Sequence, residues 1–568
     1  MKKSTSIRVC VGAVSVALLL SGCTKSSTSG SGSKGGTLYI LTQAEQILHL
    51  DPQRNYTGED LAFASGFLNR TLTQYTLSKD NNEASKLVAD LATDTGTSSD
   101  NSKTWAFTLR DGVKWEDGKP VTCADVAYGV SRTFATDVIT DGPTYAISLL
   151  DIPKTDGSSN YPGPYKATAA QQALFDKAVV CEGNKITFHL ANPAADFNYA
   201  VTLSAFAPVR KDKDTGEKYD DTVLSDGPYK IQSYKKKSKL ILVRNSNWSA
   251  STDSLRPAYP DVIEYDFAVP PLVITQRLMA DAGNDSWAIS PDGVEPTQLS
   301  VVFNDAKYTN RRLNDYDPYV RYLAINTKKV PELKHRQAIL AAINRAELRT
   351  IAGGTYAGDY ADGVIKPNIG QDYAPTGLWD GLLGDTVSPK GNVALAKKLI
   401  AESGKPFPNP LVFDYSQSPT GDKVAASIVA SLARVGIKVK PNPLESGAYY
   451  GVVLDPAKQG GMSAGGWGPD WSNASTVIPE LFTPAGGFNL SQYDNPAFTA
   501  EVQKAKAISD RAAQAKAWQA LNTKAAQLAL VVPTRFGKEQ RIQGSKVQGA
   551  YIWGPYGSYP YGALSVSQ

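Results

Sequence analysis

The residue types that build most catalytic and metal centres are scarce in this chain. Its 568 residues include three histidines, four cysteines and three methionines. His49, His189 and His335 are scattered, and none stands at metal-ligand spacing from another histidine or from a cysteine. We therefore expect neither a metal site nor a cofactor.

Catalytic sequence motifs are also missing. No G-x-x-x-x-G-K-[ST] loop is present to bind nucleotide phosphates, and no G-x-S-x-G elbow is present to carry a serine nucleophile. Carboxylate pairs are common, but nothing around them distinguishes a general acid or base from ordinary surface charge. The sequence favours a binding protein over an enzyme, and an exported hydrolase is the alternative outside that class.

The apolar run near the N-terminus is too short to span a membrane, which takes roughly 20 residues. It covers Val11 to Leu20, follows Lys2, Lys3 and Arg8, and is followed by two small residues and Cys23. This order is typical of a secretory signal peptide, here residues 1–22.

Leu20-Ser21-Gly22-Cys23 resembles a bacterial lipobox, in which the cysteine is lipidated and becomes the first mature residue. Residues 23–36 are almost entirely Ser, Thr, Gly and Lys, a composition typical of a flexible tether. We expect a lipid at Cys23 to hold the protein on the outer face of the cytoplasmic membrane. The alternative is an ordinary signal peptide with a chance cysteine.

The exported chain is nearly neutral. Cleavage removes three of the 59 basic residues and none of the 55 acidic ones, which leaves a net charge near +1. We therefore expect no nucleic-acid partner, because no electrostatic footprint for one remains. The body from residue 37 to residue 568 is too long for one ordinary core and suggests two or three domains.

Two cysteines remain beside Cys23 after export, Cys123 and Cys181. Outside the cytoplasm a disulfide between them can persist. We favour that disulfide, and two separate buried thiols are the alternative.

Strand-like and helix-like segments alternate along the body, which predicts an α/β protein. The expected strands are rich in β-branched and aromatic residues, and the expected helices carry apolar residues at i, i+3 and i+4. The strands are expected at residues 37–41, 104–110, 185–190, 239–244, 262–269 and 319–326, and the helices at 124–135, 335–351, 392–403, 422–435 and 496–530.

Four segments in register resemble the family 5 extracellular solute-binding proteins of ABC importers, the dipeptide- and oligopeptide-binding group. The most specific is LRDGVKWEDG-KPVTCADV, which reads as two short strands with Gly turns and then a helix capped near Thr122. Cys123 departs from the family pattern, and a partner at Cys181 would explain it. The other segments are residues 226–248 with D-G-P-Y-K and R-N-S-N-W, residues 335–345, and residues 466–470.

The resemblance implies a large type II periplasmic-binding-protein fold, with two α/β lobes and an extra domain inserted in the first. Lobe I would comprise residues 37–78, 206–312 and 532–568. The inserted domain would be 79–205 and would hold both remaining cysteines, and lobe II would be 313–531. The ligand would lie between the lobes.

The resemblance also implies a binding site in Gly466-Trp467-Gly468-Pro469-Asp470. Asp470 would pair with the α-ammonium group of a peptide, because charge-assisted hydrogen bonds are about twice as strong as neutral ones. The backbone of Gly466 and Gly468 would pair with an extended peptide, and Trp467 would shape a side-chain pocket. Pro469 departs from the usual motif. The alternative is that this segment is only an aromatic turn packed under lobe II.

By resemblance, then, the chain captures extracellular peptides as a monomer and delivers them to the permease subunits of an ABC importer. The alternative ligands within the family are an oligosaccharide or a nickel chelate. Nine tryptophans and 28 tyrosines leave sugars possible, whereas the scattered histidines and Asp470 count against nickel.

Overall fold

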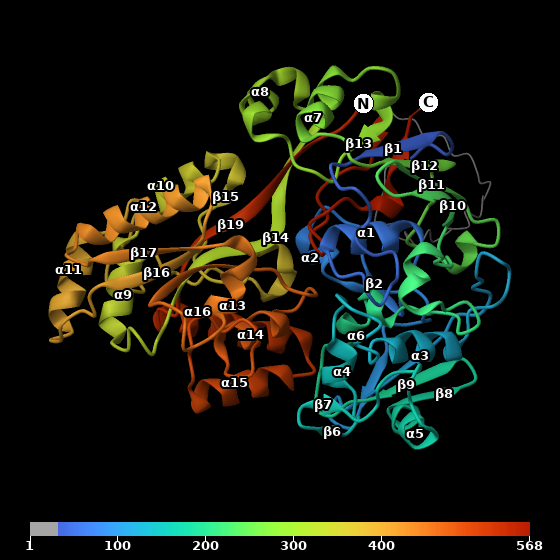
Figure 1. Ribbon diagram of the computed structural model, residues 1–568, viewed down its shortest axis with the longest axis horizontal. Helices are drawn as coiled ribbons and strands as arrows, with labels where there is room; N and C mark the ends of the chain where they lie inside the picture. Colours follow the sequence, from blue (N-terminus) through green and yellow to red (C-terminus); the bar gives the residue numbers. More distant parts are fainter. Residues whose placement is uncertain (1–31, 568) are drawn as a thin grey trace, which may run out of the picture. The chain divides into compact units, whose positions relative to one another are not determined.

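The computed structural model describes residues 32–567, so the expected signal peptide and Cys23 lie outside the described residues. Three β-sheets of four or more strands organise this part of the chain (Figure 1). We call the region around the five-stranded sheet the first lobe, that around the six-stranded sheet the second lobe, and that around the four-stranded sheet the inserted region. Between residues 32 and 567 no helix is long and apolar enough to cross a bilayer.

The sheet of the first lobe joins strands that are far apart in the sequence. Its order is β10-β11-β12-β1-β13, and β1 is parallel to both β12 and β13. Leu38 and Ile40 of β1 are fully buried, as the alternation of TLYIL predicts. The strands are β1 (Thr37–Leu41), β10 (Tyr229–Lys235), β11 (Lys239–Arg244), β12 (Val262–Asp266) and β13 (Ala288–Ile289), and helix α1 (Gly58–Phe67) packs in the same core.

The inserted region contains an antiparallel sheet of order β4-β5-β9-β8, whose core is continuous with that of the first lobe. Thr122 caps helix α3 as expected. Its hydroxyl accepts from the Asp125 backbone N–H, and the Asp125 carboxylate accepts from the Thr122 backbone N–H. A disulfide joins Cys123 to Cys181, with Cα atoms 5.8 Å apart, and so ties α3 to β8. The elements are β4 (Thr97–Ser99), β5 (Thr104–Thr108), β8 (Val179–Glu182), β9 (Lys185–His189), α3 (Cys123–Arg132), α4 (Tyr145–Leu149) and α5 (Ala169–Ala178).

The second lobe has a sheet of order β15-β19-β14-β18-β16-β17. Its two long strands, β14 and β19, pair from Arg312 opposite Ile542 to Ala324 opposite Val531, and Figure 1 shows them running up toward the first lobe. Residues 532–542, which the sequence division assigned to lobe I, therefore form hydrogen bonds within the sheet of the second lobe. The domain limits themselves stay a prediction. The strands are β14 (Arg312–Ile325), β15 (Gly358–Asp359), β16 (Leu411–Ser416), β17 (Val439–Leu444), β18 (Met462–Trp467) and β19 (Val531–Ile542).

Two expected helices of the second lobe are each split in two. Asn344 accepts from the Glu347 N–H and starts a new helix inside the expected 335–351, and Asp510 does the same with the Ala513 N–H inside 496–530. Gly404, at a φ of 62°, follows α11 as a left-handed C-terminal residue. The helices are α9 (Leu333–Ala342), α10 (Arg345–Ile351), α11 (Val393–Glu402), α12 (Pro419–Ala433), α13 (Tyr449–Val453), α14 (Ile478–Phe482), α15 (Pro496–Lys506) and α16 (Arg511–Gln527).

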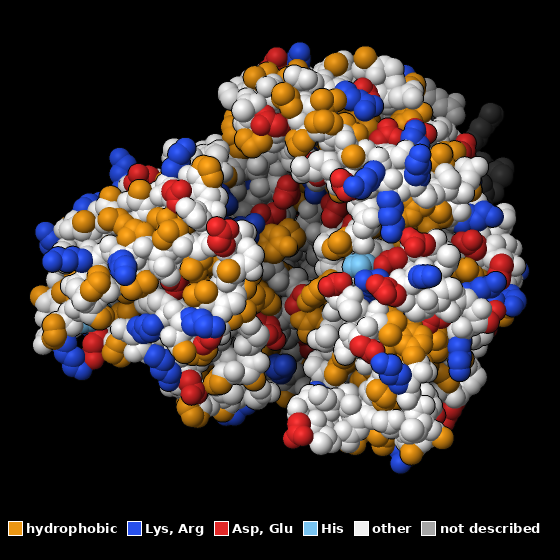
Figure 2. Space-filling model, viewed as in Figure 1, with side chains coloured by type: hydrophobic (Ala, Val, Ile, Leu, Met, Phe, Trp, Pro, Cys, Tyr) orange, Lys and Arg blue, Asp and Glu red, His pale blue; other side chains and the backbone are white. Residues whose placement is uncertain are grey.

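The surface is deeply hollowed between the two lobes. In the view of Figure 2 the hollow lies over β14, between the second lobe and the α1 side of the first lobe. Acidic, basic and apolar side chains all face it (Figure 2). A ligand that entered here would meet charges of both signs.

Candidate functional site

The expected ligand-binding segment includes an incompletely paired strand. One edge of β18 pairs with β14 from Met462 to Trp467. On the other edge β16 pairs with β18 only at Met462 and Ser463. Ala464 to Trp467 therefore present an edge that no strand of the described chain covers, and residues 464–470 are half-buried between buried neighbours on both sides.

Tyr449 marks the point where this free edge begins. Its hydroxyl lies 2.5 Å from the carbonyl oxygen of Ala464 in β18 and 3.5 Å from that of Asp414 in β16. Successive residues of a strand direct their backbone groups to alternate edges. Because the carbonyl of Ala464 points to the β16 side, the N–H and C=O of Gly466 point to the free edge, where an extended chain can pair with them.

Gly466 and Gly468 lie beneath two side chains of β14. A Cβ on Gly466 would come within 2.8 Å of Nη1 of Arg321, and a Cβ on Gly468 within 3.2 Å of the Tyr319 ring. The guanidinium carbon of Arg321 also lies 4.6 Å from the centre of the Tyr319 ring. The two glycines leave room for Arg321 and Tyr319 to extend over β18 and the segment that follows it.

Asp470 accepts hydrogen bonds from two tyrosines outside its own lobe. The hydroxyl of Tyr56, in the loop before α1, donates at 2.6 Å, and Tyr145, the first residue of α4, donates to the other carboxylate oxygen. The pKa of Asp470 is raised, chiefly by burial and further by the charge of Glu480, although the two hydroxyls lower it. Within residues 32–567 the carboxylate accepts hydrogen bonds but forms no ion pair, which suits it to a cationic group.

Trp467 stands beside the free edge as part of an aromatic wall. Its indole N–H donates to the Thr476 carbonyl at 2.7 Å, which orients the ring. The Trp467 and Phe488 ring centres are 5.0 Å apart, and those of Phe488 and Tyr450 are 5.3 Å apart. Tyr450 is 50% exposed, so the wall is open to an apolar group.

The expected site residues lie in one segment, but that segment does not act alone. Sequence reasoning missed Tyr56 and Tyr145, which precede Asp470 by 414 and 325 residues. Neither belongs to a recognisable motif, so no local signal marks them. Trp471 is buried, but not under the second lobe as the aromatic-turn alternative has it, since its ring centre lies 4.7 Å from that of Tyr145 and its N–H donates to Asp196 at 2.8 Å, both in the inserted region.

Residues 86–489 match the family described as "Bacterial extracellular solute-binding proteins, family 5 Middle". The chain belongs to this family. It is 25% identical over 428 residues to the periplasmic murein peptide-binding protein MppA of Escherichia coli K12, with 73% of each chain covered. It is 24% identical over 434 residues to the dipeptide-binding protein of the same organism, covering 72% of this chain and 74% of the relative.

Solved structures agree on the fold of this family 5 protein. The structure titled "Clavulanic acid biosynthesis oligopeptide binding protein 2" superposes with a TM-score of 0.84 at 26% identity, covering 94% of this chain and 96% of that one. The unliganded open form of MppA superposes with a TM-score of 0.71 at 18% identity. The predicted two-lobed binding-protein fold is confirmed, and the family consists of solute-binding proteins.

Proposed function

We propose that this family 5 protein is the substrate-binding component of an ABC importer and captures peptides between its two lobes. The observation that carries the proposal is Asp470, a carboxylate close to the free edge of β18 that forms no ion pair with any described residue. A peptide N-terminus supplies the missing cation, and the peptide backbone supplies a strand for the edge. Several relatives are named for dipeptides, oligopeptides or a murein peptide.

Main-chain pairing at Gly466 and Gly468 supplies affinity without reading side chains, which suits a protein that accepts many peptides. Trp467 and its aromatic wall then favour an apolar side chain on the ligand. A sugar stacks on aromatic rings too, but it offers no cation for Asp470 and no regular row of amides for the strand edge.

The substitution Asp470→Asn tests this proposal because it keeps the shape and removes the charge. Loss of one partner of a buried charge pair costs about 2–5 kcal/mol, so peptide affinity should fall by more than about tenfold. N-acetylating the peptide should weaken binding to the natural protein equally and weaken binding to the variant much less. Calorimetry on the four combinations forms a double-mutant cycle.

Equal losses on acetylation in both proteins would mean that Asp470 does not contact the amino group. Clear binding of an oligosaccharide, with no binding of any peptide, would replace the peptide by the alternative ligand.

The same proposal includes attachment to the membrane. Lipidation of Cys23 would hold the monomeric body close to the permease subunits at the outer face of the cytoplasmic membrane, and two acyl chains give stable anchoring. Mass spectrometry of the mature N-terminus should find a diacylglyceryl thioether on Cys23. A free thiol there would reject the anchor while leaving peptide capture standing.

A further inference from the structure

Two arginines face each other directly across neighbouring strands of the second lobe. Arg321 on β14 pairs in register with Arg535 on β19, and on its other side Arg321 pairs with Gly466 on β18. Residues directly opposite each other share one face of the sheet, and like charges in that position destabilise it. The row Arg535–Arg321–Gly466 therefore places Arg321 on the strand next to β18 and Arg535 one strand farther from the free edge.

Arg535 has no partner of its own in the described chain. Its Nε and Nη1 atoms are buried and make no hydrogen bond. Burial lowers the pKa of Arg535 and the charge of Arg321 lowers it further, Asp317 partly opposes them, and Arg349 adds a smaller lowering. Arg535 as a whole is half-buried, and its two buried nitrogens without a hydrogen bond are costly unless an anion approaches.

Two of the nearby carboxylates are already engaged elsewhere. Asp317 lies 2.9 Å from the Lys366 ammonium and accepts from the Tyr319 N–H at 2.6 Å, and its nearest approach to Arg321 is 3.8 Å. Asp359 lies 2.7 Å from the Lys538 ammonium. The side chain of Arg321 is 42% exposed, so its guanidinium is accessible from solvent.

We propose that Arg321 binds a carboxylate of the ligand, and that Arg535 strengthens the positive potential behind it. This assignment rests on the proposed capture of peptides and adds a second charged anchor to it. The guanidinium has the planar fork that matches a carboxylate with two parallel hydrogen bonds. Gly466 is small enough for Arg321 to lie over it, toward the edge where the peptide pairs.

The position of the two anchors limits the ligand. Asp470 follows Gly466 by four residues, whose main chain spans at most about 14 Å, and the side chains of Arg321 and Asp470 change the distance between the two charged groups. We therefore expect the preferred peptide to carry a carboxylate within a few extended residues of its free N-terminus. That carboxylate is either the C-terminus of a short peptide or an acidic side chain of a longer one.

Calorimetry with two matched pairs of peptides distinguishes the two sources. The first pair is Ala-Ala-Ala as the free acid and as the C-terminal amide. The second is Ala-Glu-Ala-amide and Ala-Gln-Ala-amide. Each is titrated into the natural protein, into Arg321→Gln, and into the control Lys440→Gln, which removes the same charge from an exposed position on β17 of the same sheet.

Removing the carboxylate in one of the pairs should weaken binding about tenfold in the natural protein and in Lys440→Gln, but about twofold or less in Arg321→Gln. The pair that shows this difference identifies the source of the carboxylate. If Arg321→Gln does not fold, Arg321→Lys is used, and it should still reduce the discrimination because lysine lacks the bidentate fork.

Two results would overturn the role of Arg321 while leaving peptide capture intact. One is an equal preference for the carboxylate in the natural protein and in Arg321→Gln, and the other is peptide binding by the natural protein with no such preference. Failure of the natural protein to bind any of the four peptides or longer peptides would overturn peptide capture, and the carboxylate site with it.

Discussion

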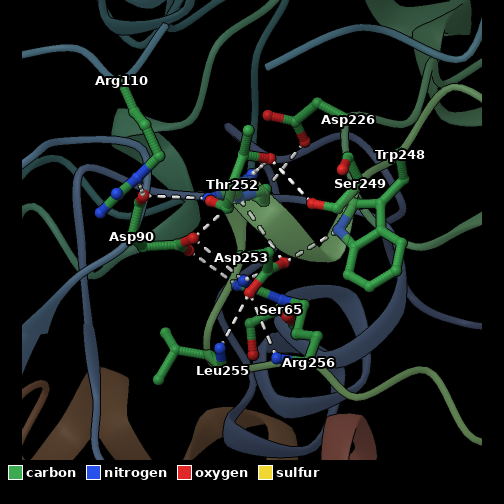
Figure 3. Close-up of polar contacts among 12 residues, drawn as sticks. Ser65, Asp90, Arg110, Asp226, Trp248, Ser249, Thr252, Asp253, Leu255 and Arg256 are labelled. Carbon is green, nitrogen blue, oxygen red and sulfur yellow. Dashed lines mark hydrogen bonds and ion pairs between the residues drawn. The ribbon is translucent and has the colours of Figure 1, made fainter. Parts of the chain in front are cut away.

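At the scale of single residues, the first lobe holds a buried network of charges (Figure 3). Asp90 accepts from Nε of Arg70 at 2.8 Å and from Nη2 of Arg256 at 2.7 Å, and Asp253 lies 3.1 Å from Arg256. Burial raises the pKa of Asp90, but Arg256 and Arg70 outweigh it and lower that pKa to about 2. Asp226, at the edge of the network, behaves in the opposite way, because burial outweighs the arginines and raises its pKa to about 7.

This contrast predicts how the stability of the protein depends on pH. The folded state keeps the proton of Asp226 up to about pH 7, whereas an unfolded aspartate releases it near 3.8. The folded state thus binds more protons in that window, so the free energy of unfolding should fall as pH rises, by at most roughly 1.4 kcal/mol per pH unit. The contribution is complete below about pH 4 and absent above about pH 7.

Urea unfolding of the natural protein and of Asp226→Asn across this range measures the effect. Asparagine can still accept the hydrogen bond that the Arg70 N–H makes to Oδ1 at 2.9 Å, but it does not titrate. The difference between the two stability curves should therefore change between about pH 4 and pH 7. Parallel curves would mean that Asp226 is ionised in the folded protein throughout.

At the scale of elements, the proposed site depends on the limited pairing of β16 with β18, two strands of six residues each that are offset along the sheet. β16 stops pairing with β18 after Ser463, and the hydroxyl of Tyr449 closes the end of that ladder. The remaining edge of β18 would be an aggregation hazard if it were long and exposed, but it is short and faces the interior of the site. Its length suits a few residues of a peptide.

A series of peptides N-methylated at one amide each tests this edge. Methylation of an amide that faces Gly466 removes a hydrogen bond and adds a steric clash, so affinity should fall by about tenfold. Methylation of the next amide along, which points away, should have little effect, because strand geometry alternates with a period of two. Calorimetry should thus give an alternating series of affinities, and a uniform series would argue against strand pairing.

At the scale of the whole molecule, hydrogen bonds connect the second lobe to the first lobe and to the inserted region. Tyr56 and Tyr145 donate to Asp470, and Asp196 of the inserted region accepts from the Trp471 indole. The tyrosines occupy the carboxylate that the ligand is proposed to use. A ligand cation must therefore share this carboxylate with them, which couples closure of the lobes to the charge of Asp470.

Replacing both tyrosines with phenylalanine should separate the lobes of the unliganded protein. A hydrogen bond to a charged group contributes about 1.5–3 kcal/mol, so their loss should shift the open-to-closed equilibrium by at least about tenfold. Small-angle X-ray scattering should report a larger radius of gyration than for the natural protein.

The matched control for this experiment is Tyr128→Phe. The Tyr128 hydroxyl donates to Asp214 at 2.8 Å, and both residues precede the second lobe in the sequence. The substitution removes a tyrosine hydroxyl that donates to a carboxylate, but it leaves the contacts between the lobes in place. An identical radius of gyration in all three proteins would show that the tyrosines do not hold the lobes together.

Several features followed from the sequence because their causes are local. The alternation of TLYIL predicted β1 at its observed bounds, and the Gly turns before Thr122 predicted a helix capped near Thr122, which is the N-cap of α3. Four short segments were enough to predict the family and its two-lobed fold, since they lie along most of the body. The resemblance of residues 466–470 to the family drew attention to Asp470 by the same route.

Other features were decided only by tertiary structure, because their causes connect distant parts of the chain. The apolar pattern of residues 496–530 runs through the break at Asp510, so periodicity alone predicted one helix where there are two. The tyrosines that meet Asp470 and the opposition of Arg321 to Arg535 arise from the docking of the lobes and from strand register across more than 200 residues. Side chains at such separations come together only when the whole core has formed, and no local pattern records their partners.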